Sequence, residues 1–373
     1  MEKEQICIIG SGNWGSAIAT VVGRNAHRLP FCHDEVRMWV FEEDVQIITN
    51  TQNNNSNKPT TVELSNVINE QHENIKYLPG IKLPTNVRAI PNLQEAVRGA
   101  TVLIFVLPHQ FLPKLLPTIR AHVNPARCHG ISLIKGLDFD ADTKVPVLIS
   151  KSIEKAMGEN QFRCGVLMGA NVADEVARQR TCESTLACDF GSDSENERIR
   201  QIFHEEHFFR VSWISDVAGA EACGALKNII ALGAGFVDGL SLGGNTKAAL
   251  LRIGLVEMTK FCTMFFEGVE KGTFMESCGV ADLITTCYGG RNRKCANEFA
   301  KRRGVDSTYL DSESCIKLWS AIESELLNGQ KLQGTLAAQE VYTLLEARNL
   351  LQEFPLMTVI YEISFKGKPV NSQ

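Results

Sequence analysis

The first half of the chain alternates short apolar runs with helical patterns. The apolar runs occupy residues 6–9, 36–41, 87–90, 102–107, 131–134 and 166–168. Several are apolar on both faces, which a parallel strand covered by helices on both sides requires. Between two of these runs, Asn92 is placed to cap a helix over residues 93–98, and Gly99 follows as its C-terminal glycine. The alternation predicts a doubly wound α/β sheet.

After about residue 214 the pattern becomes helical. Apolar positions recur at helical spacing over residues 216–240, 246–271, 292–303, 312–327 and 335–349. Almost nothing in this half is typical of a strand. We therefore predict an α/β domain over residues 1–214, followed by an all-helical domain over residues 215–373.

Two stretches are typical of surface insertions. Residues 51–61 include the run Asn53-Asn54-Asn55-Ser56-Asn57, which is too polar to bury and rich in turn formers. Residues 304–314 have a similar character. We expect both stretches to lie outside the regular elements.

The composition is that of an ordinary globular protein. Of the 373 residues, 44% are hydrophobic and 22% are charged. Lys and Arg number 38 against 43 Asp and Glu, which gives a formal net charge of −5. This balance is too acidic for generic binding to nucleic acid or anionic lipid. An anionic ligand must therefore be held by a local site.

The N-terminus and the cysteines bear on the compartment. The first five residues carry charges of both signs, so no secretory signal is visible, and no stretch reaches the roughly 18 uninterrupted apolar residues of a membrane span. The twelve cysteines are scattered without a Cys-x-x-Cys pair. This spacing argues against a zinc site and for reduced thiols. We expect a cytosolic protein without a membrane span or a metal.

A glycine motif follows the first apolar run. Gly10-Ser11-Gly12-Asn13-Trp14-Gly15 matches G-x-G-x-x-G and opens a helical pattern. In this context Gly10 permits a tight turn, Gly12 lets the backbone approach a pyrophosphate, and Gly15 lets the helix and strand pack closely. The alternative is a glycine turn without a ligand. The placement favours a Rossmann-type dinucleotide site.

An aromatic residue and two acids follow the second apolar run. Phe41 at its tip would stack on adenine, while Glu42 and Glu43 would oppose the extra 2′-phosphate of NADP. The alternative is that Phe41 belongs to the core and the acids are solvated. The first interpretation favours NAD.

Two lysines stand in apolar surroundings. Lys135 ends the run 131–134, and strand ends in such sheets face the ligand crevice. Lys227 lies within residues 222–232, which are otherwise nearly all apolar. Burial of its ammonium would lower the pKa and make it a usable proton donor and acceptor near neutral pH. The alternatives are a solvated Lys135 and a Lys227 that reaches the solvent by its stem.

A third cluster runs from Ala281 to Lys294. It combines an acid in apolar company, Asp282, with Thr286 and a pair of glycines, followed by Arg291 and Asn292 at a predicted helix start. Glycines followed by Arg and Asn at a helix N-terminus suit a phosphate or carboxylate. The alternatives are an ordinary solvated basic face and a weak cluster of the nuclear-import type.

These residues make the chain recognisable. It resembles the cytosolic NAD-dependent glycerol-3-phosphate dehydrogenases of eukaryotes over nearly its whole length. The resemblance rests on residues 10–19, 108–111, 131–136, 167–171, 222–236, 244–250, 277–294 and 328–334. It implies a Rossmann domain followed by a helical substrate domain, a cytoplasmic location and a homodimer.

The resemblance also implies roles for individual residues. The expected reaction is reversible hydride transfer between NADH and dihydroxyacetone phosphate, with Lys227 as general acid/base. The implied catalytic residues are Lys227, Lys135, Asp282 and Thr286, and the implied substrate-binding residues are Lys135, Arg291 and Asn292. The implied NAD-contacting residues are Gly10, Ser11, Gly12, Asn13, Trp14, Gly15, Phe41, Phe111, Ala173, Arg291, Lys331 and Gln333. The alternatives are a related two-domain dehydrogenase that acts on another small phosphorylated or carboxylated alcohol, and a catalytically idle NAD(H)-binding sensor or partner-regulating protein of the same fold.

Overall fold

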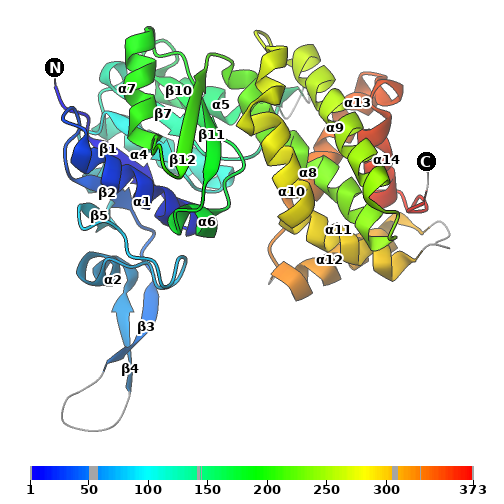
Figure 1. Ribbon diagram of the computed structural model, residues 1–373, viewed down its shortest axis with the longest axis horizontal. Coiled ribbons are helices and arrows are strands. Elements are labelled where there is room, and N and C mark those ends of the chain that lie inside the picture. The colour runs from blue at the N-terminus through cyan, green and yellow to red at the C-terminus, as the bar shows by residue number, and fades with distance from the viewer. Residues whose placement is uncertain are drawn as a thin grey trace. The chain divides into compact units, whose positions relative to one another are not determined.

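The computed structural model describes residues 2–49, 58–140, 143, 145–304, 310–327 and 329–371. The chain forms two compact units (Figure 1). Unit 1 consists of Met1–Ile134, Ile149–Leu167 and Asn171–Ser215, and unit 2 of Lys135–Leu148, Met168–Ala170 and Asp216–Gln373. The predicted domains meet at one boundary after residue 214. The two units differ from this division, because two short segments of the N-terminal half pack with the helical unit. One of them carries Lys135.

Unit 1 is built on an eight-stranded sheet. Its strands are β1 (Ile6–Ile9), β2 (Val36–Trp39), β5 (Val87–Ile90), β6 (Val102–Phe105), β7 (His129–Ser132), β10 (Arg163–Met168), β11 (Cys182–Ala187) and β12 (Phe209–Ile214). The order is β12-β11-β10-β7-β6-β1-β2-β5, and β1 pairs in parallel with both β2 and β6. The order therefore reverses at β1, which is where ligands bind in doubly wound sheets.

Helices cover both faces of this sheet, and β1 shows why. Ile6 and Ile8 pack into one apolar cluster with α1 (Asn13–Arg28) and α7 (Asp193–Phe203). Cys7 and Ile9 pack into another with α3 (Leu93–Val97), α4 (Leu112–His122) and α5 (Ile149–Gly158). Successive residues of a strand point to opposite faces, so a strand covered on both sides is apolar throughout. The doubly wound prediction is confirmed.

The residues predicted to cap α3 do so in the structure. The side chain of Asn92 accepts a hydrogen bond from the Glu95 N–H at 3.1 Å, as the predicted cap requires. Gly99 follows the helix with a φ of +67°. The prediction missed β11 and β12, whose exposed positions Glu183 and Arg210 interrupt the apolar runs.

The predicted insertion 51–61 needs a correction at its end. Residues 58–61 belong to β4 (Lys58–Glu63), which pairs antiparallel with β3 (Asp44–Thr49). A two-stranded ladder is held by backbone hydrogen bonds, so its polar composition does not prevent it. Residues 50–57 lie outside the described residues. The remaining helices of unit 1 are α2 (Leu64–Gln71) and α6 (Ala173–Ala177).

Unit 2 is helical around one central helix. Its helices are α8 (Val217–Gly239), α9 (Gly244–Phe265), α10 (Asp282–Gly289), α11 (Arg291–Arg303), α12 (Ser312–Leu327), α13 (Gln333–Ala347) and α14 (Pro355–Phe365). A short hairpin, β8 (Asp138–Phe139) with β9 (Pro146–Val147), also belongs to it. Helix α8 packs against α9, α10, α11, α13 and α14. Helix α8 is long and apolar enough to cross a membrane, but all residues of its apolar stretch are buried inside the protein, as in the core helix of a folded unit.

The predicted helices of this half are present with shifted ends, while α10 and α14 were missed. In the described residues from Asp216 onward, no strand occurs. The predicted insertion 304–314 is wrong at its C-terminal end, because α12 already begins at Ser312. Asp311 accepts hydrogen bonds from the Ser314 N–H and hydroxyl, both at 2.8 Å, and so caps the helix whose start at Ser312 the sequence predicted. Residues 305–309 lie outside the described residues.

Candidate active site

The glycine turn after β1 has the predicted geometry. Gly10 has a φ of +118°, and a Cβ there would lie 2.3 Å from the Val106 carbonyl oxygen. A Cβ on Gly15 would lie 2.1 Å from the Gly10 oxygen, so the helix start and the strand end meet without room for a side chain. A Cβ on Gly12 would meet nothing within 4 Å. Two glycines are thus required by the fold, while the third faces open space.

The start of α1 is suited to an anion. Gly12 is its N-cap and supplies no side-chain capping bond, and no acidic residue lies in the first turn. The first N–H groups of a helix have no intrahelical acceptor and lie at the positive end of its dipole. The open space at Gly12 lets a ligand approach these groups, so the turn fits the pyrophosphate of NAD.

The other predicted cofactor residues of unit 1 lie at element starts and loops. Phe41 is 71% exposed and Phe111 is 48% exposed, which excludes the interpretation of Phe41 as a core residue. Ala173 is the first residue of α6. In the turn itself, the Ser11 carbonyl accepts a bond from Ser16, and the Asn13 side chain donates to the Tyr77 carbonyl at 2.8 Å. The partly buried Trp14 lies at the edge of the core.

The two acids after β2 are not free carboxylates. Glu42 accepts bonds from the N–H and the hydroxyl of Ser65. Glu43 forms an ion pair with Lys76 and accepts a 2.5 Å bond from the Tyr77 hydroxyl. The interpretation of both acids as solvated side chains is therefore wrong, because each is bound to a neighbour, and their opposition to a 2′-phosphate stays a prediction.

Unit 2 gathers four predicted residues into one cluster. The Lys227 Nζ lies 2.5 Å from Asp282 Oδ1 and 2.7 Å from Thr286 Oγ1. The Lys135 Nζ lies 2.8 Å from Asp282 Oδ2 and 2.8 Å from the carbonyl oxygen of Gly169. Asp282 and Thr286 share one face of α10, one turn apart, and α10 packs on α8, which carries Lys227.

Burial controls the charges in this cluster. The side chains of Lys227 and Asp282 are 6% and 3% exposed, which excludes a Lys227 that reaches the solvent by its stem. Burial lowers the pKa of Lys227 to about 8. The Asp282 carboxylate acts in the opposite direction and raises this pKa, while the positive charge of the nearby Lys135 lowers it. Burial alone would raise the pKa of Asp282, but the two lysines hold it below its ordinary value. One carboxylate between two lysines leaves excess positive charge for an anionic ligand.

Arg291 and Asn292 begin α11. The helix has Gly290 as its N-cap, without a side-chain capping bond. Arg291 is exposed and donates to Gln330 Oε1 at 3.2 Å. Asn292 is buried, and its side chain donates to Asn228 Oδ1 at 2.9 Å and accepts from the Gly334 N–H at 2.9 Å. Arg291 is therefore the more accessible group, and Asn292 ties it to the helix that carries Lys227.

Lys331 lies between α12 and α13, and Gln333 begins α13. Lys331 pairs with Glu323 of α12 at 2.7 Å rather than with the lysine cluster. Gln333 is the exposed first residue of α13. The structure therefore does not bring these two residues to Lys227.

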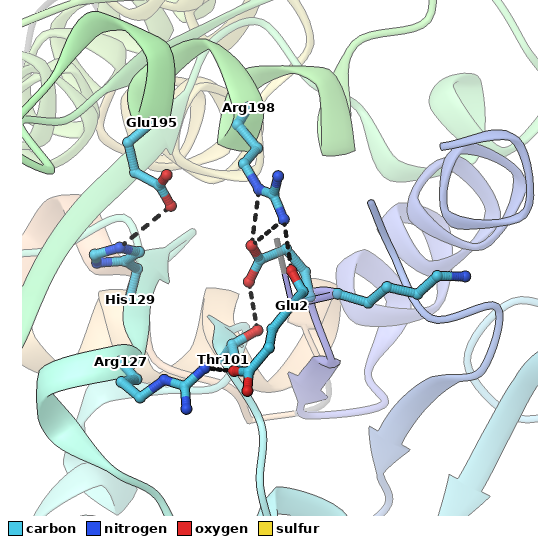
Figure 2. Close-up of a pocket in the computed structure, with 8 residues that line it drawn as sticks. Glu2, Thr101, Arg127, His129, Glu195 and Arg198 are labelled. Carbon is cyan, nitrogen blue, oxygen red and sulfur yellow. Dashed lines mark hydrogen bonds and ion pairs between the residues drawn. The ribbon is translucent and has the colours of Figure 1, made fainter. Parts of the chain in front are cut away.

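Unit 1 also holds a cavity of about 270 Å³ away from the glycine turn (Figure 2). It is lined by Glu2, Lys3, Glu4, Thr101, Arg127, His129, Glu195 and Arg198. Glu4 is paired with Arg198 at 2.7 Å, and Glu2 with Arg127. Its residues lie at the amino ends of β1, β6 and β7 and on α7, whereas ligands bind at the carboxyl ends of the strands. We therefore do not assign the cofactor to it.

Comparisons with known proteins agree with this arrangement. The model of the N-terminal part of NAD-dependent glycerol-3-phosphate dehydrogenase matches residues 5–194, and the model of its C-terminal part matches residues 216–373. The cytoplasmic NAD(+) glycerol-3-phosphate dehydrogenase of Rattus norvegicus is 46% identical over 371 residues, which cover 99% of this chain and 96% of the relative. The chain belongs to the NAD-dependent glycerol-3-phosphate dehydrogenase family.

Solved structures of glycerol-3-phosphate dehydrogenases support the family assignment. The Saccharomyces cerevisiae structure is 39% identical with a TM-score of 0.84, and the match covers 99% of this chain and 98% of that one. The Plasmodium falciparum structure is 35% identical with a TM-score of 0.85, covering 99% and 93%. Membership confirms the predicted fold, the NAD cofactor and the oxidoreductase class. The predicted cytosolic location agrees with the name of the rat relative.

Some site residues were missed by the reading of the sequence. Asn228 and the Gly169 carbonyl bind predicted residues, and Gln330 contacts Arg291. Asn228 had a usable signal, since a second polar residue directly after Lys227 in an apolar helix needs a buried partner. The other two had none, because a carbonyl carries no sequence signal and Gln330 lies in a polar loop.

Proposed function

We propose that the protein catalyses reversible hydride transfer between NADH and dihydroxyacetone phosphate, giving sn-glycerol 3-phosphate. NAD, when bound, supplies or accepts the hydride at nicotinamide C4. The glycine turn holds its pyrophosphate, and Phe41 and Phe111 offer exposed aromatic surface to the rest of the cofactor. Arg291, Lys331 and Gln333 are the further cofactor candidates of unit 2.

Lys227 has the geometry of a general acid/base. An ammonium has three N–H donors, and Asp282 and Thr286 receive two of them. The third is directed to the C2 oxygen of the substrate, which gains a proton in the reduction and loses it in the oxidation. A pKa of about 8 lets the same group serve both directions near neutral pH.

The remaining residues hold the substrate. Lys135 is one-quarter exposed, so its charge borders the open side of the cluster and stabilises negative charge on the substrate oxygen. Arg291 offers forked donors to the phosphate, and the start of α11 adds N–H groups from Asn292 onward.

The cluster of Lys227, Asp282 and Lys135 carries this proposal. A protein that only sensed NAD(H) would not need a buried lysine with a lowered pKa. The deciding experiment is NADH oxidation by the purified protein with dihydroxyacetone phosphate. Turnover is expected, and clear NADH binding without turnover would favour the idle sensor.

We also propose a homodimer formed through unit 2. The family resemblance implies this assembly, and α9 leaves Ile253, Val256 and Met264 exposed by 36%, 55% and 45%. Their spacing puts them on one face of the helix, and exposed apolar patches mark interaction sites. Sedimentation equilibrium is expected to give twice the chain mass for the wild type and a monomer for Val256→Glu.

A further inference from the structure

A short loop segment of unit 1 is tied to the glycine turn. The Asn74 side chain donates to the Ser11 carbonyl and to the Ser16 hydroxyl, both at 2.8 Å. From the other direction, the Asn13 side chain donates to the Tyr77 carbonyl at 2.8 Å. Asn74 is fully buried, so these bonds fix the segment 74–77 against the turn that binds the cofactor phosphates.

The same segment is tied to the acids after β2. The Tyr77 hydroxyl donates to Glu43 Oε1 at 2.5 Å, and Lys76 forms an ion pair with the other oxygen of Glu43. The Lys76 ammonium also lies 5.2 Å from the centre of the Tyr77 ring, which adds a cation–π contact. A cation therefore stands beside the end of β2, on a segment that touches the phosphate-binding turn.

In a dinucleotide-binding fold, the residues that follow the second strand contact the adenosine ribose. An acid after the second strand binds the 2′-hydroxyl in NAD enzymes, and a cation nearby accommodates the 2′-phosphate in NADP enzymes. Here both kinds of residue are present and bound to each other. Partial burial would raise the pKa of Glu43, but the bonds from Lys76 and Tyr77 lower it, so Glu43 is charged at neutral pH.

We propose that Glu43 makes the site select NAD(H) against NADP(H) by holding Lys76 in an ion pair. The inference rests on the proposed function only in that this turn binds a dinucleotide. Lys76 would otherwise offer its charge to a 2′-phosphate. Glu42 has no such role, because it is bonded to Ser65 at the start of α2.

The test compares binding of two fragments, ADP-ribose and 2′-phospho-ADP-ribose, by calorimetric titration of the full chain. Four variants are needed: Glu43→Gln, Lys76→Met, the double variant, and Glu42→Gln as a matched control that changes the net charge equally. The wild type is expected to prefer ADP-ribose. Glu43→Gln is expected to bind 2′-phospho-ADP-ribose about tenfold more tightly, with less than about a threefold change for ADP-ribose. The gain should shrink in high salt.

The double variant is expected to lose this gain, and Glu42→Gln is expected not to show it. An equal gain in Glu42→Gln would mean that net charge alone is responsible, and a gain that survives Lys76→Met would exclude Lys76; either result overturns the proposal. So would no gain in a folded Glu43→Gln. Lys76→Met alone leaves Glu43 without its cation and is expected to bind 2′-phospho-ADP-ribose no more tightly than the wild type does; tighter binding in this variant would also contradict the proposal.

Kinetics separate this proposal from the proposed function. The ratio of kcat/KM values for NADH and NADPH is expected to fall in Glu43→Gln together with the fragment preference. If the fragments behave as expected but dihydroxyacetone phosphate is not reduced, the proposed reaction is wrong and the selectivity inference stands. If reduction is normal with NADH and the fragment preference does not move, the selectivity inference alone is wrong.

Discussion

The glycine turn of unit 1 and the lysine cluster of unit 2 both suit anionic ligands, by opposite means. The turn uses backbone N–H groups and the absence of side chains, as the open space at Gly12 shows. The cluster uses side-chain charges that are buried around Asp282. A backbone site has no protonation state to control, whereas buried ammonium groups change pKa and can move protons. We therefore propose cofactor binding for the first region and proton transfer for the second.

The largest effect is expected from removing the proton donor. Lys227→Ala should lower kcat by about 10²–10⁴-fold, the usual contribution of a positioned general acid/base, while largely sparing NADH affinity. Lys227→Arg should not restore activity, because a guanidinium does not release a proton near neutral pH. Steady-state kinetics and NADH titration measure both effects.

A second buried lysine supplies the control for this variant. Lys247 of α9 is paired at 2.7 Å with Asp238, which lies about three turns beyond Lys227 near the end of α8. Lys247→Met should retain kcat within about tenfold, since Lys247 is not part of the cluster. A Lys227→Ala enzyme that keeps half of the wild-type kcat would remove Lys227 from the mechanism.

The next largest effect is expected at the phosphate. Arg291→Ala should cost on the order of 3–5 kcal/mol in kcat/KM for dihydroxyacetone phosphate, as for a charged partner left unpaired. The much poorer turnover of unphosphorylated dihydroxyacetone should barely change. Equal fractional losses on both substrates would show that Arg291 supports the fold or the cofactor instead.

The smallest effects separate binding from folding within the glycine turn. Gly12→Val should leave the thermal midpoint nearly unchanged and raise the KM for NADH by roughly tenfold or more, because its side chain enters the open space. Gly15→Val should destabilise unit 1 by about 1–3 kcal/mol, because its Cβ would overlap the Gly10 oxygen. Thermal unfolding and NADH titration of both variants decide this, and an unstable Gly12→Val would contradict it.

The two regions also differ in how far the sequence predicts them. The turn depends on six consecutive residues after an apolar strand, so its position and glycine roles follow from local sequence. The cluster depends on residues as far apart as Lys135 and Asp282, and only the family resemblance connected them. Burial of Lys227 was predictable from its apolar neighbours. The side chains that Lys227 contacts were not predictable from its neighbours in sequence. The ion pair of Glu43 with Lys76 and the strands β11 and β12 were not predictable either, because all of these features depend on tertiary contacts.

The central claim is that burial and Asp282 give Lys227 a pKa near neutrality and that this group moves the proton. The most direct test is the pH dependence of kcat/KM in both directions. The reduction of dihydroxyacetone phosphate needs the protonated lysine and should fall as pH rises through about 8, whereas the oxidation of glycerol 3-phosphate needs the neutral lysine and should rise through the same value. Rates that pass through this range without change, or a transition that persists in Lys227→Ala, would contradict the claim.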